Sequence, residues 1–373
     1  MVLHARRVAF TLALGYLVPT LLAAQESTTV GGYGEIQYVN PSGPGTPATL
    51  DVRRFVIYLA HTFSDRLSLR SEVEIEDAKI ESSSPLGEVA LEQLVFDYRL
   101  ADRFTLRSGL LLVPIGIINE THEPPTFNGV DRPAFDHDVL PTTWREIGVG
   151  AVGMLPIEGW SYRLYLLNGL VAAGFADADG IREGRQEGQA ATFANPSLTG
   201  RLDWVRPGLR VGASFWYGGS TAGDTALGSG SFDAPVTVLS ADGRYDQGPL
   251  AVRAVFAYVS VADAEAINTR YGTAVGSRIA GGYGEAAVNL LYWIAPASTQ
   301  RLNAFVRHER YDTQARVPAG TIRDRAFARR LTTLGLTYKP TWNTAFKGDY
   351  QIVRNAAGTA PSEVLSLGIG YQF

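Results

Sequence analysis

A short polar motif after a long apolar run holds the side chains best suited to chemistry. Asn119-Glu120-Thr121-His122-Glu123 follows residues 108–118, which carry no charge. Carboxylates and imidazoles are common metal ligands, so this spacing raises the question of a cation site. A zinc site needs further ligands at fixed spacing, and no two further histidines are aligned with the motif. The motif therefore predicts a polar loop, with no metal and no cofactor.

The loop that contains this motif is acidic along its whole length. Residues 113–143 carry five carboxylates but a single arginine. Its charged and titratable residues are Glu120, His122, Glu123, Asp131, Arg132, Asp136, His137 and Asp138. If the loop narrows a channel, Glu120, His122, Glu123, Asp131 and Arg132 are the expected constriction residues, and their net negative charge would repel anions.

A second group of candidate residues consists of arginines on predicted strands. Each lies on the polar face of its strand, because side chains alternate between the two faces. Arginine is always charged and can bind an oxyanion with two parallel hydrogen bonds, so these residues predict an anion track. The alternative is that they pair with glutamates such as Glu72, Glu146 and Glu309 and only line a wet wall. The seven arginines are Arg70, Arg107, Arg163, Arg210, Arg253, Arg301 and Arg307.

No linear catalytic motif accompanies these charges. The chain has no cysteine, which excludes thiol nucleophiles and thiolate metal sites. No G-x-S-x-G elbow and no Ser/His/Asp order is present. We therefore expect a protein that is not an enzyme. A barrel hydrolase and a structural or adhesive barrel stay open as alternatives, which a conductance measurement would separate from a pore.

The elements that must position these residues are strands. We count sixteen candidates of about 9–13 residues, the length of a tilted membrane-crossing strand. In 67–77, for example, Leu69 and Val73 alternate with Arg70 and Glu72, and in 87–100 the alternation slips at Glu92-Gln93, which predicts a β-bulge. Short turns alternate with long loops. The pattern predicts an all-β protein, a closed antiparallel transmembrane β-barrel of sixteen or eighteen strands.

The last nine residues show the alternation most clearly. Leu365, Leu367, Ile369, Tyr371 and Phe373 occupy every second position. A strand with this apolar face suits lipid outside and water inside, and Tyr371 with Phe373 resembles the signal by which the barrel-assembly machinery recognises outer-membrane proteins. Tryptophans at predicted strand ends, including Trp160, Trp204, Trp216 and Trp342, predict interfacial girdles.

The first 24 residues differ from the rest of the chain. Arg6 and Arg7 precede an uncharged run that ends at Ala24, which is typical of a cleaved secretory signal. We expect a signal peptide at 1–24, a barrel domain at 25–373 and a location in the bacterial outer membrane. Cleavage would make the net charge of −4 more negative by two units, and no basic tract remains, so nucleic acid is not an expected partner.

Four stretches together resemble the phosphate-selective porin O/P family. They are 31–38, 88–100, the loop from Asn119 to Pro133, and 161–170 with its Asn168-Gly169-Leu170 ending. The resemblance implies a sixteen-stranded channel, often a homotrimer, with an inward-folded loop and lumen arginines that guide anions such as phosphate. We therefore expect passive diffusion of small hydrophilic solutes and ions with a modest preference for anions, which the acidic loop would oppose.

Overall fold

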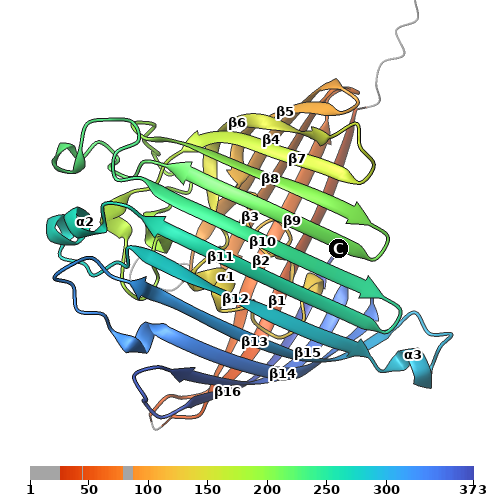
Figure 1. Cartoon of the computed structure of the whole chain (residues 1–373). Coiled ribbons are helices and arrows are strands. Elements are labelled where there is room, and N and C mark those ends of the chain that lie inside the picture. Colours follow the sequence, from red (N-terminus) through yellow and green to blue (C-terminus); the bar gives the residue numbers. More distant parts are fainter. Residues whose placement is uncertain (1–25, 44, 79–86) are drawn as a thin grey trace, which may run out of the picture.

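The chain forms one closed antiparallel β-barrel in the computed structural model, which describes residues 26–43, 45–78 and 87–373. Each strand pairs with its neighbours in sequence, and β1 pairs with β16 to close the sheet (Figure 1). The prediction of sixteen strands is confirmed and the alternative of eighteen is wrong, whereas the predicted signal peptide lies outside the described residues. The strands are β1 (Ser27–Pro41), β2 (Thr49–Thr62), β3 (Leu67–Glu76), β4 (Val89–Ala101), β5 (Phe104–Leu112), β6 (Arg145–Met154), β7 (Trp160–Asn168), β8 (Pro196–Arg206), β9 (Leu209–Gly218), β10 (Val236–Gln247), β11 (Leu250–Val261), β12 (Arg278–Asn289), β13 (Arg301–Arg316), β14 (Ala328–Thr341), β15 (Thr344–Asn355) and β16 (Ser362–Gln372).

The alternation in sequence becomes an outside and an inside. On β3, Val73 faces outward and is 38% exposed, while its neighbour Glu74 faces inward and is buried. Apolar side chains on the outer face recur around the barrel, as at Phe256 and Leu367. Closure satisfies the hydrogen bonds of every strand edge, so a chain without disulfides is held by its backbone ladder.

The predicted bulge is present in β4. Glu72 pairs with Gln93 and Val73 pairs with Leu91, so Glu92 is the extra residue. The bulge keeps Gln93 and Leu91 on their proper faces and also turns Glu92 inward, where its side chain is fully buried.

Helical segments are short and lie between strands. The α-helices are α1 (Phe135–Asp138), α2 (Ala264–Tyr271) and α3 (Leu291–Ile294), and the 3-10 turns are η1 (Pro124–Thr126), η2 (Ala172–Gly174), η3 (Arg182–Gly184), η4 (Thr225–Leu227) and η5 (Arg325–Phe327). None of the helices in the described part of the chain has the length and hydrophobicity that a membrane-crossing helix needs. β12 ends at Asn289, whose side chain accepts hydrogen bonds from the amides of Leu291 and Leu302 where the chain turns into α3.

Part of the inner wall is apolar, contrary to the expected polar interior. Val236, Val238 and Val255 of β10 and β11 face inward and are fully buried in a hydrophobic cluster with residues of the 113–144 segment. Trp216 belongs to this cluster and packs against Trp144, with ring centroids 5.4 Å apart, so its predicted place in an outer girdle is wrong. An inward-folded segment therefore covers these apolar wall residues and keeps them from contact with water.

The closing seam between β1 and β16 is covered by two aromatic rings. Phe373 exchanges two backbone hydrogen bonds with Gly32, at 2.8 and 3.0 Å. The Tyr371 ring lies over Gly34, where a Cβ would come within 2.7 Å of the tyrosine hydroxyl. Glycine in β1 therefore makes room for the rings that end β16.

Candidate functional site

The segment 113–144 between β5 and β6 lies inside the barrel, and arginines of the wall hold one side of it. Arg201 of β8 donates to the carbonyl of Gly116 at 2.9 Å, and Arg244 of β10 donates to that of Ile117 at 2.8 Å. We call this stretch the inner segment. Figure 1 shows its helix α1 within the outline of the barrel.

Carboxylates of the wall hold the other side of the inner segment. Asp349 of β15 accepts from the amide of Val130 at 2.6 Å, and Glu309 of β13 accepts from the amide of Phe135 at 2.9 Å. Because bonds to charged partners are stronger than neutral ones, contacts on both sides fix the segment against the wall.

The acidic residues of the inner segment are mostly neutralised. Glu120 pairs with Arg163 at 2.9 Å, and Asp138 pairs with Arg329 and His137. Asp136 is fully buried, and burial together with the neighbouring Glu309 carboxylate raises its pKa to about 8. The strongly repulsive acidic constriction that the sequence suggests is therefore much weakened in the folded chain.

The other predicted constriction residues separate into two places. Asp131 and Arg132 line a cavity of about 380 Å³ near the long loops, which we call the loop-side cavity. Its arginines and carboxylates are equal in number among the lining residues, so it favours neither sign. His122 and Glu123, with Glu120, line a separate cavity of about 350 Å³ beside the seam, the seam cavity.

His122 contacts the wall rather than its neighbours Glu120 and Glu123. Its Nε2 lies 2.8 Å from the Tyr33 hydroxyl and 3.5 Å from Glu92 Oε2, and its Nδ1 lies 3.1 Å from the carbonyl of Asn119. Burial lowers the pKa of His122, but the Glu92 carboxylate raises it more, so this pKa lies above the ordinary histidine value.

All seven predicted arginines occupy inward-facing positions. Four of them, together with Arg244, line a cavity of about 260 Å³ whose only lining carboxylate among the described residues is Glu120. We call it the arginine cavity. The four lie near the starts of β3, β5, β7 and β9, on the short-turn side of the barrel, and are Arg70, Arg107, Arg163 and Arg210.

The remaining three arginines lie elsewhere. Arg253 donates to the carbonyl of Thr126 at 2.8 Å, and Arg301 pairs with Asp246 at 3.3 Å. Arg307 is almost fully buried, pairs with Glu285 at 2.9 Å and lines the loop-side cavity. The structure therefore gathers four of the seven at one point rather than placing all of them along one track.

The alternative that the arginines pair with carboxylates is confirmed for six of the seven, but the partners it named, Glu72, Glu146 and Glu309, are wrong. The four arginines of the arginine cavity pair with aspartates on neighbouring strands: Arg107, for example, donates to both oxygens of Asp97, at 2.7 and 2.8 Å. Asp203 accepts from Arg163 and Arg210, at 2.8 and 2.9 Å. Strand register decides these partners: Arg107 lies directly opposite Asp97, and Arg163 and Arg210 lie diagonally opposite Asp203, within reach of a long side chain.

Sequence reasoning missed two arginines of this region. Arg244 lines the arginine cavity, and Arg201 lies beside it between Asp203 and Asp242. Both stand on the inward face of predicted strands, so the alternation that selected Arg210 could also have selected them. Their importance comes from contacts with the inner segment, which no local pattern shows.

Comparison with known sequences finds a clear relative. No protein-family model matches the chain. A protein of Aquifex aeolicus (strain VF5), described as an uncharacterized protein, is 34% identical over 349 residues, which cover 90% of this chain and 78% of that protein.

Solved structures of outer-membrane proteins match along nearly the whole chain. Salmonella typhi OmpF in complex with daunomycin has a TM-score of 0.58 at 14% identity and covers 93% of this chain and 97% of its own. The outer membrane channel DcaP of Acinetobacter baumannii has a TM-score of 0.58 at 12% identity, covering 94% and 100%. The trimer form of Vibrio cholerae OmpT has a TM-score of 0.55 at 12% identity, covering 93% and 99%. At these identities the matches establish a shared fold.

Proposed function

Because the chain belongs to the family of the Aquifex aeolicus protein and has the fold of outer-membrane porins, we propose that it is a porin of the bacterial outer membrane. In this proposal it gives passive diffusion to small hydrophilic solutes and ions, with a modest preference for anions such as phosphate. The observation that carries the proposal is the arginine cavity, a charged, water-accessible space inside a closed barrel.

The outer surface of the barrel supports the proposed location. Its outward side chains include many exposed aliphatic and aromatic residues, as at Leu239 and Leu334, which lipid would cover. In this proposal residues 1–24 are a signal peptide, residues 25–373 are the barrel domain, and the barrel-assembly machinery inserts the chain. A homotrimer, the form named for one of the structural neighbours, is the proposed assembly.

The preference for anions follows from the balance of charges near the inner segment. Five arginines and one glutamate line the arginine cavity, and Arg244 has no carboxylate partner within ion-pair distance among the described residues. Arg70 is only loosely paired, with 3.5 Å between its guanidinium and Asp97. Fixed positive charge at a narrow point attracts anions more than the charge of exposed loops can repel them.

The membership of the phosphate-selective porin O/P family is a finer proposal. It is supported by the sequence resemblance and by the gathered arginines. The same arginines would attract other oxyanions, because bidentate contacts recognise carboxylates as well as phosphates.

Purified barrel in planar lipid bilayers tests the proposal. Stepwise conductance is expected, and the reversal potential in a KCl gradient should show anion preference. Arg244→Gln should reduce the anion-to-cation permeability ratio by about two- to fivefold, since one unit charge contributes roughly 1 kcal/mol at close range in water. Arg201 still donates to the adjacent Gly116 carbonyl in this variant, so the inner segment keeps a contact with the wall there.

The matched control is Arg354→Gln, which removes an exposed arginine from the outer face of β15. It should leave the ratio unchanged. Absence of conductance would contradict the porin proposal and favour the alternatives, a barrel enzyme or a structural barrel. A cation preference that Arg244→Gln does not alter would contradict the role of the arginine cavity but not the porin proposal.

A further inference from the structure

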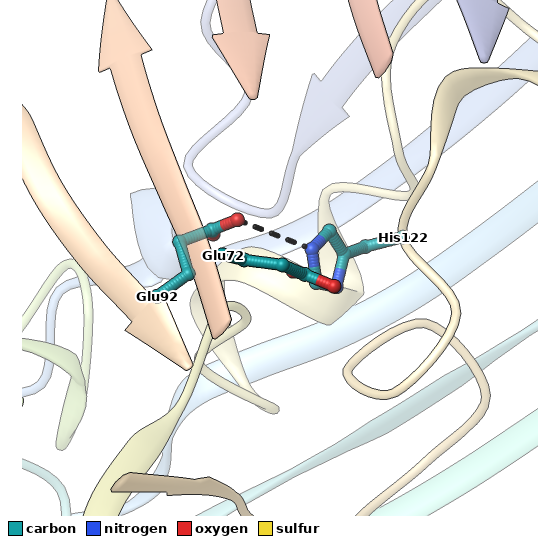
Figure 2. A group of neighbouring side chains, drawn as sticks. All are labelled: Glu72, Glu92 and His122. Carbon is teal, nitrogen blue, oxygen red and sulfur yellow. Dashed lines mark ion pairs between the residues drawn. The ribbon is translucent and has the colours of Figure 1, made fainter. Parts of the chain in front are cut away.

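Three side chains from two parts of the fold converge beside the seam cavity. Glu72 comes from β3, Glu92 from the bulge of β4 and His122 from the inner segment, and Figure 2 shows the two carboxylates reaching from the wall toward the imidazole. One ligand atom of each lies within 4.8 Å of the others. The three residues are separated by at least 20 positions in sequence, so only the fold brings them together.

The cluster carries carboxylate oxygens that the protein does not satisfy. Glu92 is 0% exposed, yet its Oε1 has no hydrogen-bond partner among the described residues. Glu72 Oε2 is also buried without a partner. A buried carboxylate oxygen without a partner is costly, and a cation is one way to compensate it.

Arginines do not provide that compensation. Among the described residues neither Glu72 nor Glu92 pairs with an arginine or a lysine, and Arg54 of the adjacent strand donates instead to Glu35 and Glu74. Within ion-pair distance, two carboxylates therefore face one imidazole, and the Arg132 guanidinium acts on Glu92 only from farther away. A divalent cation would neutralise both carboxylates and bind a neutral imidazole.

The imidazole is also oriented as a metal ligand. The Asn119 carbonyl can accept a hydrogen bond only, so its 3.1 Å contact places a proton on His122 Nδ1 and aims Nε2 at the cluster. Metal-binding histidines are typically held this way, by a backbone carbonyl at the other nitrogen. The Tyr33 hydroxyl lies 2.8 Å from Nε2 and 2.9 Å from Glu92 Oε2, at the edge of the same space.

From these observations we infer that Glu72, Glu92 and His122 form a binding site for a divalent transition-metal ion such as Zn²⁺. One nitrogen and two carboxylate ligands suit Zn²⁺, with a fourth position for water. Small side-chain rotations would bring the ligand atoms to the usual 2.0–2.2 Å from the metal. Glu72 and His122 line the seam cavity, which provides the entry path. The ion would join the inner segment to β3 and β4, a contact that the proposed transport does not require.

Zinc binding by the full barrel, produced without a histidine tag, tests the inference. After treatment with EDTA and dialysis, the protein is titrated with ZnCl₂, and retained zinc and the thermal unfolding temperature are measured. One zinc per chain and a higher unfolding temperature are expected. Glu92→Gln and His122→Asn should each weaken zinc binding at least tenfold, because each removes a ligand.

Two variants serve as controls. Glu120→Gln removes a carboxylate that lines the same cavity but lies outside the cluster, and His137→Asn removes the other histidine of the inner segment, which lies with Asp138 and Asp179 in a second, more exposed group. Both should retain zinc. Failure of the wild-type barrel to bind zinc, or binding that survives the double change of Glu92 and His122, would overturn the inference. If those variants do not fold, anomalous X-ray scattering from a zinc-soaked wild-type crystal decides, since a peak elsewhere also overturns it.

Discussion

At the scale of single residues, Asp136 shows how the barrel interior changes an ordinary side chain. It lies in α1 of the inner segment with neither carboxylate oxygen bonded among the described residues. Burial, and next the Glu309 carboxylate, raise its pKa to about 8, so at neutral pH it is mostly protonated. The unfolded chain releases this proton near pH 4.

Stability should therefore depend on pH through Asp136. The folded state binds the proton between about pH 4 and pH 8 and the unfolded state does not, so this contribution to stability is complete below pH 4 and lost as pH rises to about 8. Asp136→Asn should raise the unfolding temperature at pH 8–9 and flatten its dependence on pH. Thermal unfolding of the barrel from pH 5 to pH 9 measures this.

Asp138→Asn is the matched control with the opposite sign. Burial raises the pKa of Asp138. Hydrogen bonds from His137 and Tyr311 and the charge of Arg329 outweigh this effect and hold the pKa below its ordinary value. Its removal should lower stability at neutral pH. Equal pH profiles for wild type and Asp136→Asn would contradict the assignment of Asp136.

Arg201 gives a second prediction at this scale. It donates to Asp203, to both oxygens of Asp242 and to the Gly116 carbonyl, and its side chain is 1% exposed. Arg201→Met would leave Asp242 buried without this partner and should cost about 3–5 kcal/mol. Arg206→Met, at an exposed pair with Glu158, should cost less than about 1 kcal/mol. Urea unfolding in detergent compares them, and similar losses would show that burial of the Arg201 network is not decisive.

At the scale of elements, β16 both closes the sheet and ends the chain. Phe373 bonds to Gly32 through two backbone hydrogen bonds, and its ring stacks beside Tyr371 with centroids 6.5 Å apart. The last residue is therefore part of the seam as well as of the proposed assembly signal.

Deletion of Phe373 should lower the amount of folded barrel in the outer membrane while export continues. The seam loses two hydrogen bonds and an aromatic contact, and the proposed assembly signal loses its terminal residue. Heat-modifiable mobility of the barrel in membrane fractions measures folded protein. Phe346→Ala, which removes an exposed outward phenylalanine from β15, is the control and should assemble normally. An unchanged level after deletion would count against a role for Phe373.

At the scale of the whole molecule, the position of the inner segment determines which charges face the arginine cavity. Glu120 pairs with Arg163, so it masks one positive charge of the arginine cavity. The net negative charge of the chain is therefore a poor guide to selectivity.

Replacing Glu120 with glutamine should increase the preference for anions, because Arg163 loses one of its two carboxylate partners. Reversal potentials in a KCl gradient measure the effect, which should be about two- to fivefold in the permeability ratio. Glu265→Gln, in α2 outside the barrel wall, should have little effect. A larger effect at Glu265 than at Glu120 would show that surface charge governs permeation.

The sequence by itself determined the strands, their inner and outer faces, and the bulge at Glu92. Because side chains alternate between the two faces of a strand, the sequence indicates which residues share a face, and it placed all seven arginines correctly on the inside. It also indicated the closing strand through 365–373, whereas the expectation of an inward-folded loop came from the family resemblance.

Only the tertiary structure decided which of these residues meet. Strand pairing chose Asp97 and Asp203 as partners of the arginines, and closure of the sheet brought Tyr33 of β1 toward Glu92 of β4. The inner segment covered apolar wall residues, buried Trp216 and carried His122 to Glu72 and Glu92. Such contacts join residues far apart in the chain, and their geometry depends on the barrel's register and on the path of one long loop, neither of which a local pattern of residue types contains.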